Sequence, residues 1–111
     1  MNYYHIWANH KEGVDPRDFA HKMRRFLDKL VDSGRMSSYK LTRMKLGFRS
    51  IDLPEFHIIM EFETMQHLDD AMTAILENEA NIDDVHVAFN QLVDGETIQH
   101  ALYRDYPDEQ S

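Results

Sequence analysis

The stretch 53–63 constrains the fold of this chain more than any other segment. Its apolar residues occupy every second position, and the positions between them are mixed: Phe56, Ile58, Met60 and Phe62 alternate with His57, Ile59 and Glu61. Successive side chains of a strand point to opposite faces, so one face of this strand must be buried against apolar groups. The other face is half polar, which is typical of a central strand with helices on one side and a pocket on the other.

The length of 111 residues predicts one domain, 1–111, with residues 105–111 as an acidic tail. The absence of cysteine excludes disulfides, thiolate metal sites and thiol nucleophiles. It is typical of a reducing compartment, so we expect a cytoplasmic protein. No basic region followed by an apolar run opens the sequence, and no apolar stretch is long enough for a bilayer, so we expect no membrane contact.

The formal net charge of −8 is unevenly distributed. Residues 1–49 hold eleven of the twelve Lys and Arg but only five of the twenty Asp and Glu. The basic half alone would favour nucleic acid, but the acidic half of the same small domain would repel phosphate. We therefore expect the two halves to attract each other and predict no nucleic-acid partner.

Periodicity predicts the secondary structure. An aromatic, β-branched run predicts a strand over 2–8, and Asp15 before Pro16 predicts the start of a helix that ends before Gly34. Residues 36–48 again have a strand pattern, but the parity of their apolar positions changes, which predicts a bulge near Thr42. The basic side chains of this stretch are typical of an edge strand.

The second half of the chain has similar signals. Thr64 is a candidate cap for a helix that ends near Glu79, and a short helix is predicted over 81–93 with Gly95 as its stop. Residues 98–104 predict the last strand. The order strand, helix, strand, strand, helix, short helix, strand predicts an α+β, ferredoxin-like split βαβ fold, with a four-stranded antiparallel sheet of spatial order 4-1-3-2.

This arrangement would place the two main helices side by side on one face of the sheet. The first carries a basic set and the second an acidic set that would then face each other: Lys22, Arg24, Arg25 and Lys29 against Asp69, Asp70, Glu77 and Glu79. The opposite face of the sheet would carry Tyr3, His5, Trp7, His57, Ile59 and Glu61. An aromatic patch of this kind marks an interface or a ligand groove, and two such sheets facing each other would enclose a cavity.

These features resemble the dimeric α/β-barrel superfamily, which includes stress-responsive α/β-barrel proteins and antibiotic-biosynthesis-type, cofactor-independent monooxygenases. The similar stretches are 4–7, 39–48, 53–58 and 101–108, and the nearest likeness is to an uncharacterised marine and alphaproteobacterial group. The resemblance implies a homodimer in which two sheets form a barrel. Trp7 and Asn9 are similar to the Trp and Asn of some of those monooxygenases, although no third partner is matched.

Histidine is the candidate catalytic residue type, because its pKa lies near neutral pH. We predict His5 and His57 as general bases, with Tyr3 or Tyr103 orienting a phenol or an enol. Packing of the same side chains in the dimer cavity is an equally good interpretation. Together with His100 and Glu61, the two histidines would make a nitrogen-rich metal site if all faced the cavity, but no short ligand spacing is present and we predict no metal.

The predicted function is a homodimeric barrel that binds a small, largely apolar molecule, fatty-acid-like or aromatic, between its two sheets without a cofactor. The predicted ligand-binding residues are Tyr3, His5, Trp7, His57, Ile59, Glu61 and Tyr103. Whether a reaction follows binding is left open by the sequence. The alternative is a structural or stress-associated interaction protein whose cavity is filled by its own side chains.

Overall fold

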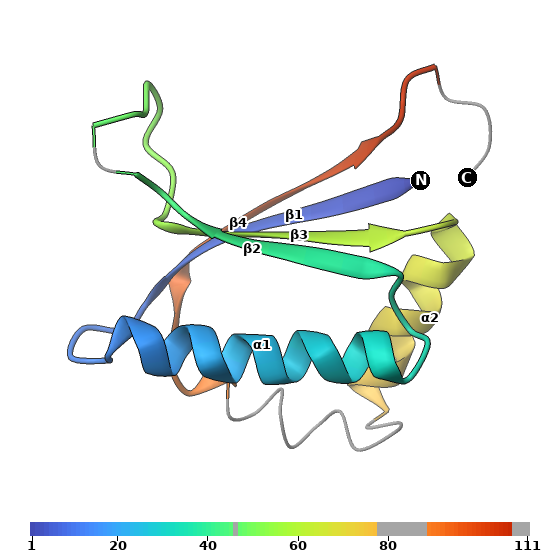
Figure 1. The fold of residues 1–111 in the computed structure, drawn as a ribbon, viewed down its shortest axis with the longest axis horizontal. Helices are drawn as coiled ribbons and strands as arrows, with labels where there is room; N and C mark the ends of the chain where they lie inside the picture. Colours follow the sequence, from blue (N-terminus) through green and yellow to red (C-terminus); the bar gives the residue numbers. More distant parts are fainter. Residues whose placement is uncertain (46, 78–88, 108–111) are drawn as a thin grey trace.

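A computed structural model describes residues 1–45, 47–77 and 89–107 of the chain. In this part the elements are, in order, β1 (Asn2–His10), α1 (Pro16–Asp32), β2 (Ser38–Arg43), β3 (Phe56–Phe62), α2 (Met65–Leu76) and β4 (Val93–Arg104). The sheet order is β2-β3-β1-β4 with antiparallel neighbours, and both helices lie on one side of it (Figure 1). The predicted ferredoxin-like fold is confirmed, with β1 and β3 at the centre.

Both helices begin at the predicted caps. The Asp15 carboxylate accepts a hydrogen bond from the backbone N–H two residues on at 2.8 Å, and Pro16 fills the first helical position. The Thr64 hydroxyl accepts from the backbone N–H three residues on at 3.0 Å. Neither of the helices in the described ranges is long and apolar enough to cross a membrane.

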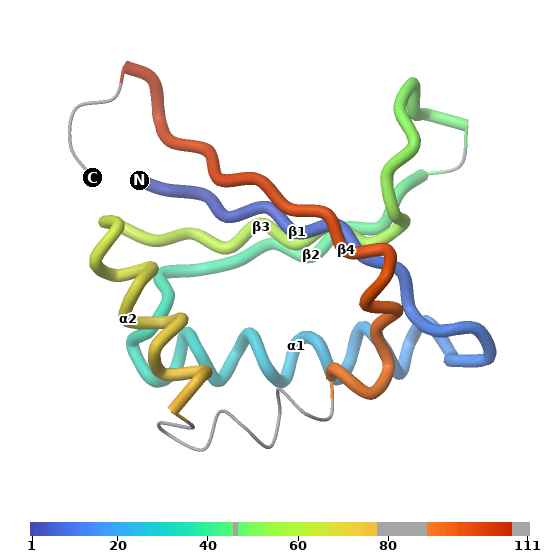
Figure 2. Tube along the Cα trace, turned by 180° about the vertical axis from the view of Figure 1, so that it is seen from behind, coloured from blue at the N-terminus to red at the C-terminus, as the bar shows by residue number. Residues whose placement is uncertain are grey.

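The core lies between the sheet and the two helices, and α1 contributes most of its helical residues. Phe56, Ile58, Met60 and Phe62 of β3 are buried against the apolar stripe of α1, which consists of Phe19, Met23, Phe26, Leu27 and Leu30. The view from behind shows that both helices lie on this side and that neither lies on the other side of the sheet (Figure 2). We call the helix-free side the open face.

The predicted bulge near Thr42 is wrong. The register of β2 with β3 runs without a shift from Ser38 to Arg43, and the strand ends there rather than at residue 48. The chain then leaves the sheet after Met44, whose N–H donates to the carbonyl of Glu55 at 2.7 Å. The change in parity thus marks the start of a loop. The irregularity of the sheet lies instead in the pairing of β1 with β4, between Trp7 and Asn9.

The last strand is longer than predicted. It begins at Val93, which pairs with His10 of β1 and is buried, and it includes Gly95. The sequence pattern of an apolar pair followed by glycine resembled the end of a helix, but sheet pairing overrides that local signal. Helix α2 ends at Leu76 with Glu77 as its C-cap, a few residues before the predicted end near Glu79. Of the predicted short helix, Phe89 and Asn90 are helical, and residues 81–88 lie outside the described residues.

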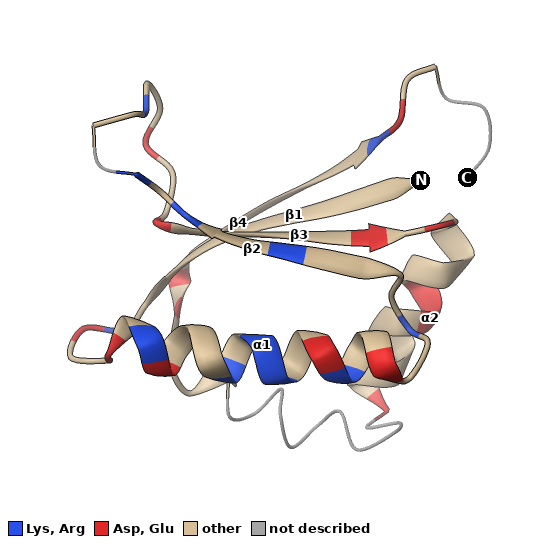
Figure 3. Cartoon of the chain, viewed as in Figure 1, with Lys and Arg blue, Asp and Glu red and all other residues tan. Residues whose placement is uncertain are grey.

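Among the residues that the structure describes, no ion pair joins α1 to α2; Glu79 of the predicted acidic set lies outside them. Figure 3 shows basic residues along α1 and acidic residues on α2. The ion pairs among the described residues lie elsewhere: Met1–Asp105, Arg17–Asp15, Arg43–Glu55 and Arg49–Asp52. The Arg24 guanidinium lies 3.5 Å from the Tyr39 hydroxyl of β2, so this cation faces the sheet edge and not α2.

Two phenylalanines provide a matched test of the core. Phe62 is fully buried, whereas the Phe48 residue is 79% exposed. We expect Phe62→Ala to lower the free energy of unfolding by about 3–5 kcal/mol, because it removes core contacts and leaves a cavity. Phe48→Ala should change it by less than about 0.5 kcal/mol. Urea denaturation of both variants measures this difference, and equal losses would contradict the assigned core.

Candidate functional site

The pairing of β1 with β3 and with β4 brings the predicted site residues onto the open face. Tyr3 lies opposite Glu61 and Tyr103, His5 opposite Ile59 and Ala101, and Trp7 opposite His57 and Gln99. These positions alternate with the buried ones, so their side chains point away from the helices. All seven residues that the sequence predicts as ligand-binding therefore share one face of the sheet, and their role stays a prediction.

Four rings on this face contact one another and form what we call the ring layer: His5, Trp7, His57 and Tyr103. The rings of Trp7 and His57 are stacked, with centroids 4.6 Å apart and planes 10° apart. The His5 ring lies 5.1 Å from that of His57 and 4.7 Å, edge-on, from that of Tyr103. The ring layer thus makes a continuous aromatic surface across β3, β1 and β4.

The two histidines of the ring layer are joined by a hydrogen bond. His5 Nδ1 and His57 Nε2 lie 2.9 Å apart, so one of these nitrogens carries the proton and the other accepts it. Burial lowers the pKa of His5, and burial followed by the neighbouring His5 lowers the pKa of His57. Both shifts favour the neutral form of the two rings.

The two tyrosines predicted to orient a substrate differ in what their hydroxyls contact. The Tyr3 hydroxyl donates to Asp105 Oδ1 at 2.7 Å, and this hydrogen bond raises the pKa of Tyr3. Ser38 donates in the same way to the Glu61 carboxylate. The Tyr103 hydroxyl has no hydrogen-bond partner within the described ranges, and the residue is exposed. Tyr103 is therefore the better placed of the two for a ligand.

His100 lies on the other face of the sheet. It pairs with Ile6, and its Nδ1 lies 3.1 Å from the Tyr4 hydroxyl. His100 therefore does not converge with His5, His57 and Glu61. The described part of the chain contains no cluster of three or more histidine and acidic side chains suited to a metal ion.

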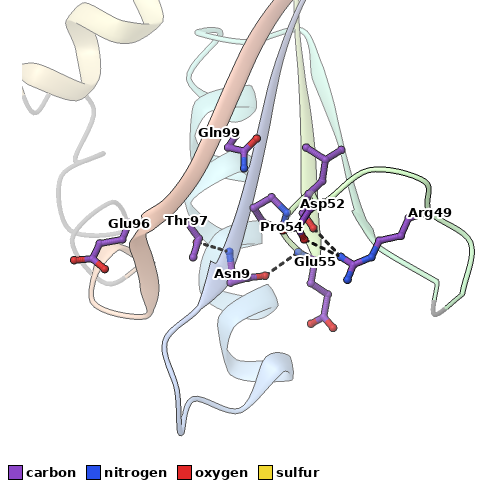
Figure 4. Close-up of a pocket in the computed structure, with 9 residues that line it drawn as sticks. Asn9, Arg49, Asp52, Pro54, Glu55, Glu96, Thr97 and Gln99 are labelled. Atoms are coloured by element: carbon purple, nitrogen blue, oxygen red, sulfur yellow. Dashed lines mark hydrogen bonds and ion pairs between the residues drawn. The ribbon is translucent and has the colours of Figure 1, made fainter.

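A polar pocket of about 370 Å³ adjoins the ring layer, at the end of the sheet where β3 begins (Figure 4). Its polar lining includes Asn9, Arg49, Asp52, Glu55, Thr97 and Gln99. Asn9 is held from both sides, because its Oδ1 accepts from the N–H of Glu55 at 2.8 Å and its N–H donates to Thr97 Oγ1 at 3.0 Å. Gln99 is the register partner of Trp7, so the pocket lies next to the ring layer.

A second pocket was not predicted from the sequence. It has a volume of about 250 Å³, lies between the sheet and the helices, and is lined by apolar side chains such as Ile6, Ile58 and Met72. Tyr4 also lines it and contributes a polar group through the hydrogen bond to His100. The one sequence feature that could have indicated this pocket is Tyr4. It occupies a core-facing position of the first strand, where a purely apolar residue would pack equally well.

Comparisons with known proteins agree with this fold. A family model described as "Family of unknown function (DUF6614)" matches residues 1–111. Three of the similar solved structures each cover 95% of this chain. The first is At3g17210 from Arabidopsis thaliana, with a TM-score of 0.72, 15% identity and 95% of that chain covered.

The second is a dimeric ferredoxin-like protein of unknown function from Jannaschia sp. CCS1, with a TM-score of 0.67, 12% identity and all of that chain covered. The third is a variant of SnoaB, a cofactor-independent oxygenase from Streptomyces nogalater, with a TM-score of 0.65, 14% identity and 91% of that chain covered. No curated protein is significantly similar in sequence. At these identities the structural likeness shows the fold alone.

The lowered pKa values of the histidine pair predict a pH effect on stability. Below pH of about 6.5, the unfolded chain binds protons at His5 and His57 more readily than the folded chain does. The free energy of unfolding should therefore fall between pH 7.5 and 5.5. The fall should be smaller in the double variant His5→Asn, His57→Gln, whose side chains do not titrate. Urea denaturation at the two pH values measures both, and an equal fall would contradict the burial of the pair.

Proposed function

This chain belongs to DUF6614, a family of unknown function, and we propose that it forms a homodimer that holds a small, largely apolar molecule between two facing sheets. The observation that carries the proposal is the ring layer. Its histidines and tryptophan are half-buried already in one chain, although neither helix covers the open face. A contiguous aromatic surface left uncovered is typical of an interface or a ligand site.

The occupant of the open face is a second copy of this chain. Solved structures with the same fold are described as dimeric, including the Jannaschia protein. A stable interface buries at least about 1,200 Å² in total, and a four-stranded sheet face covered by its equivalent provides an area of this order. Facing sheets would enclose both copies of the ring layer, which is why the cavity becomes a place for a ligand.

The composition of the open face supports an apolar ligand with a polar head. Trp7 and Ile59 offer apolar contact for its body, and the histidine pair offers one donor and one acceptor for its polar head. Apolar walls with a few convergent polar groups are the usual make-up of a small-molecule site. The amides of Asn9 and Gln99 in the adjoining pocket would receive a second polar group. The structural likeness to a cofactor-independent oxygenase supports a reaction that needs no cofactor.

The alternative is that the two ring layers fill the space between the sheets and leave no room for a ligand. The protein would then act through its outer surface, as a structural or stress-associated interaction protein. The polar pocket favours ligand binding, because it keeps about 370 Å³ open at the end of the ring layer.

A second location for the ligand is supported by the pocket between sheet and helices. It is apolar, about 250 Å³ in volume, and has the hydroxyl of Tyr4 as a polar group. Variants of Met72, which lines this pocket and is remote from the open face, distinguish the two locations.

The dimer has a direct test in the single tryptophan of the chain. In the dimer Trp7 is covered by the partner, so its fluorescence emission should be shifted to shorter wavelength and should move to longer wavelength on dilution. Light scattering at micromolar concentration should give twice 13.2 kDa. A folded monomer at that concentration would contradict the proposed dimer.

Ligand binding is tested with 2-naphthoic acid and its uncharged amide by calorimetry. We expect Trp7→Ala to weaken both about tenfold, because both lose the same ring contact. His57→Leu should weaken the acid more than the amide, and binding of the acid to the native protein should strengthen as the pH falls through the lowered pKa of the pair. Met72→Ala is the control and should leave both affinities unchanged. Loss of binding in Met72→Ala with full binding in Trp7→Ala would place the ligand in the other pocket.

A further inference from the structure

The hydrogen bond between His5 and His57 fixes the proton positions on both rings. When His5 Nδ1–H donates to His57 Nε2, the outer nitrogen of His5, Nε2, is a bare acceptor. The outer nitrogen of neutral His57, Nδ1, then carries a proton. In the other neutral arrangement His57 Nε2–H donates to His5 Nδ1, His5 Nε2 carries a proton and His57 Nδ1 is bare. In either arrangement the neutral pair presents one acid and one base to a ligand.

The two outer nitrogens belong to side chains on the open face. Neither His5 Nε2 nor His57 Nδ1 has a hydrogen-bond partner within the described ranges. The ring centroids are 5.1 Å apart, so the acid and the base belong to neighbouring side chains of one surface. Trp7, stacked on His57, provides an aromatic surface beside them.

Resting on the function proposed above, we propose that the pair is a proton relay that tautomerises an enolisable carbonyl compound with an aromatic or similarly flat apolar body. His5 Nε2 removes a proton from the carbon next to the carbonyl. The His5 Nδ1 proton passes to His57 Nε2, and the His57 Nδ1 proton passes to the carbonyl oxygen. The ketone becomes its enol, one C–H bond is replaced by one O–H bond, and no oxidant or cofactor takes part.

Both rings are neutral before and after this step, so no charge accumulates at the site. A single histidine would have to become an imidazolium, which burial disfavours. The other titratable or charged groups on the open face are distributed over all four strands: Tyr3 on β1, Lys40 on β2, Glu61 on β3 and Tyr103 on β4. Tyr3 and Glu61 are bonded to Asp105 and Ser38, respectively. Proton exchange with water resets the pair for the next cycle.

The test uses two enolisable probes, the acid phenylpyruvate and the neutral diketone benzoylacetone. Proton NMR in D2O follows the replacement of hydrogen by deuterium at the carbon next to the carbonyl. We expect the native dimer to accelerate this exchange over an equal concentration of free imidazole, for at least one probe. No acceleration with either probe overturns the relay, and failure of both to bind overturns the proposed substrate class and the relay with it.

Two variants distinguish the effect of proton transfer from the effect of the hydrogen bond alone. The amide of asparagine lies where histidine has Nδ1, and that of glutamine lies where histidine has Nε2. His5→Asn and His57→Gln therefore keep a hydrogen bond between the strands but cannot pass a proton. Each should lower the exchange rate at least about a hundredfold, because general acid–base catalysis usually contributes at least this factor to a rate. His100→Asn, on the opposite face, is the control and should leave the rate unchanged.

Binding of each probe is measured separately by quenching of Trp7 fluorescence. Variants that bind the probe but lose exchange support the relay, and variants that retain exchange overturn it. If the native protein binds a probe but does not accelerate its exchange, the relay is overturned and the proposed binding function stands. Absence of all ligand binding at the open face would instead contradict the proposed function.

A measurement without any ligand completes the test. Nitrogen-15 NMR distinguishes the protonated and bare nitrogens of each imidazole. At pH 7 the relay requires His5 and His57 to be neutral, with one protonated and one bare nitrogen in each ring. A charged imidazolium at either position at this pH would overturn the relay.

Discussion

The pairing of β1 with β3 is the constraint on which the rest of the structure depends. With Ile6 opposite Ile58 and Trp7 opposite His57, the core positions of both strands face the helices, and every ring of the candidate site on these strands faces away. A shift of one residue would exchange the two faces. The burial of Phe56, Ile58, Met60 and Phe62 under α1 opposes such a shift, so the core also positions the site.

The same pairing explains how His5 and His57 meet. They are not direct partners, because His5 lies opposite Ile59 and His57 opposite Trp7. Diagonal neighbours in a sheet are within reach of long and aromatic side chains, and stacking of Trp7 on His57 leaves the imidazole beside that of His5. A structural contact between rings thereby produces a pair of nitrogens suited to proton transfer.

The sequence predicted the elements whose period is regular. Alternation in the central strands assigned all their residues to the correct face, and the caps at Asp15 and Thr64 located both helix starts. The facing of His100 was not predictable, because it depends on the register of β4, and that register shifts between Trp7 and Asn9. The hydrogen bond within the histidine pair and the two pockets depend on side-chain positions and loop paths, which no periodicity encodes.

Native mass spectrometry of protein purified directly from cells tests the central claim most directly, because it reports the assembly and any retained molecule together. The claim is that a second copy covers the open face and that the enclosed space holds a ligand. It predicts the mass of two chains of 13.2 kDa with an additional small molecule that is lost on denaturation. A folded monomer that carries no added mass would contradict it.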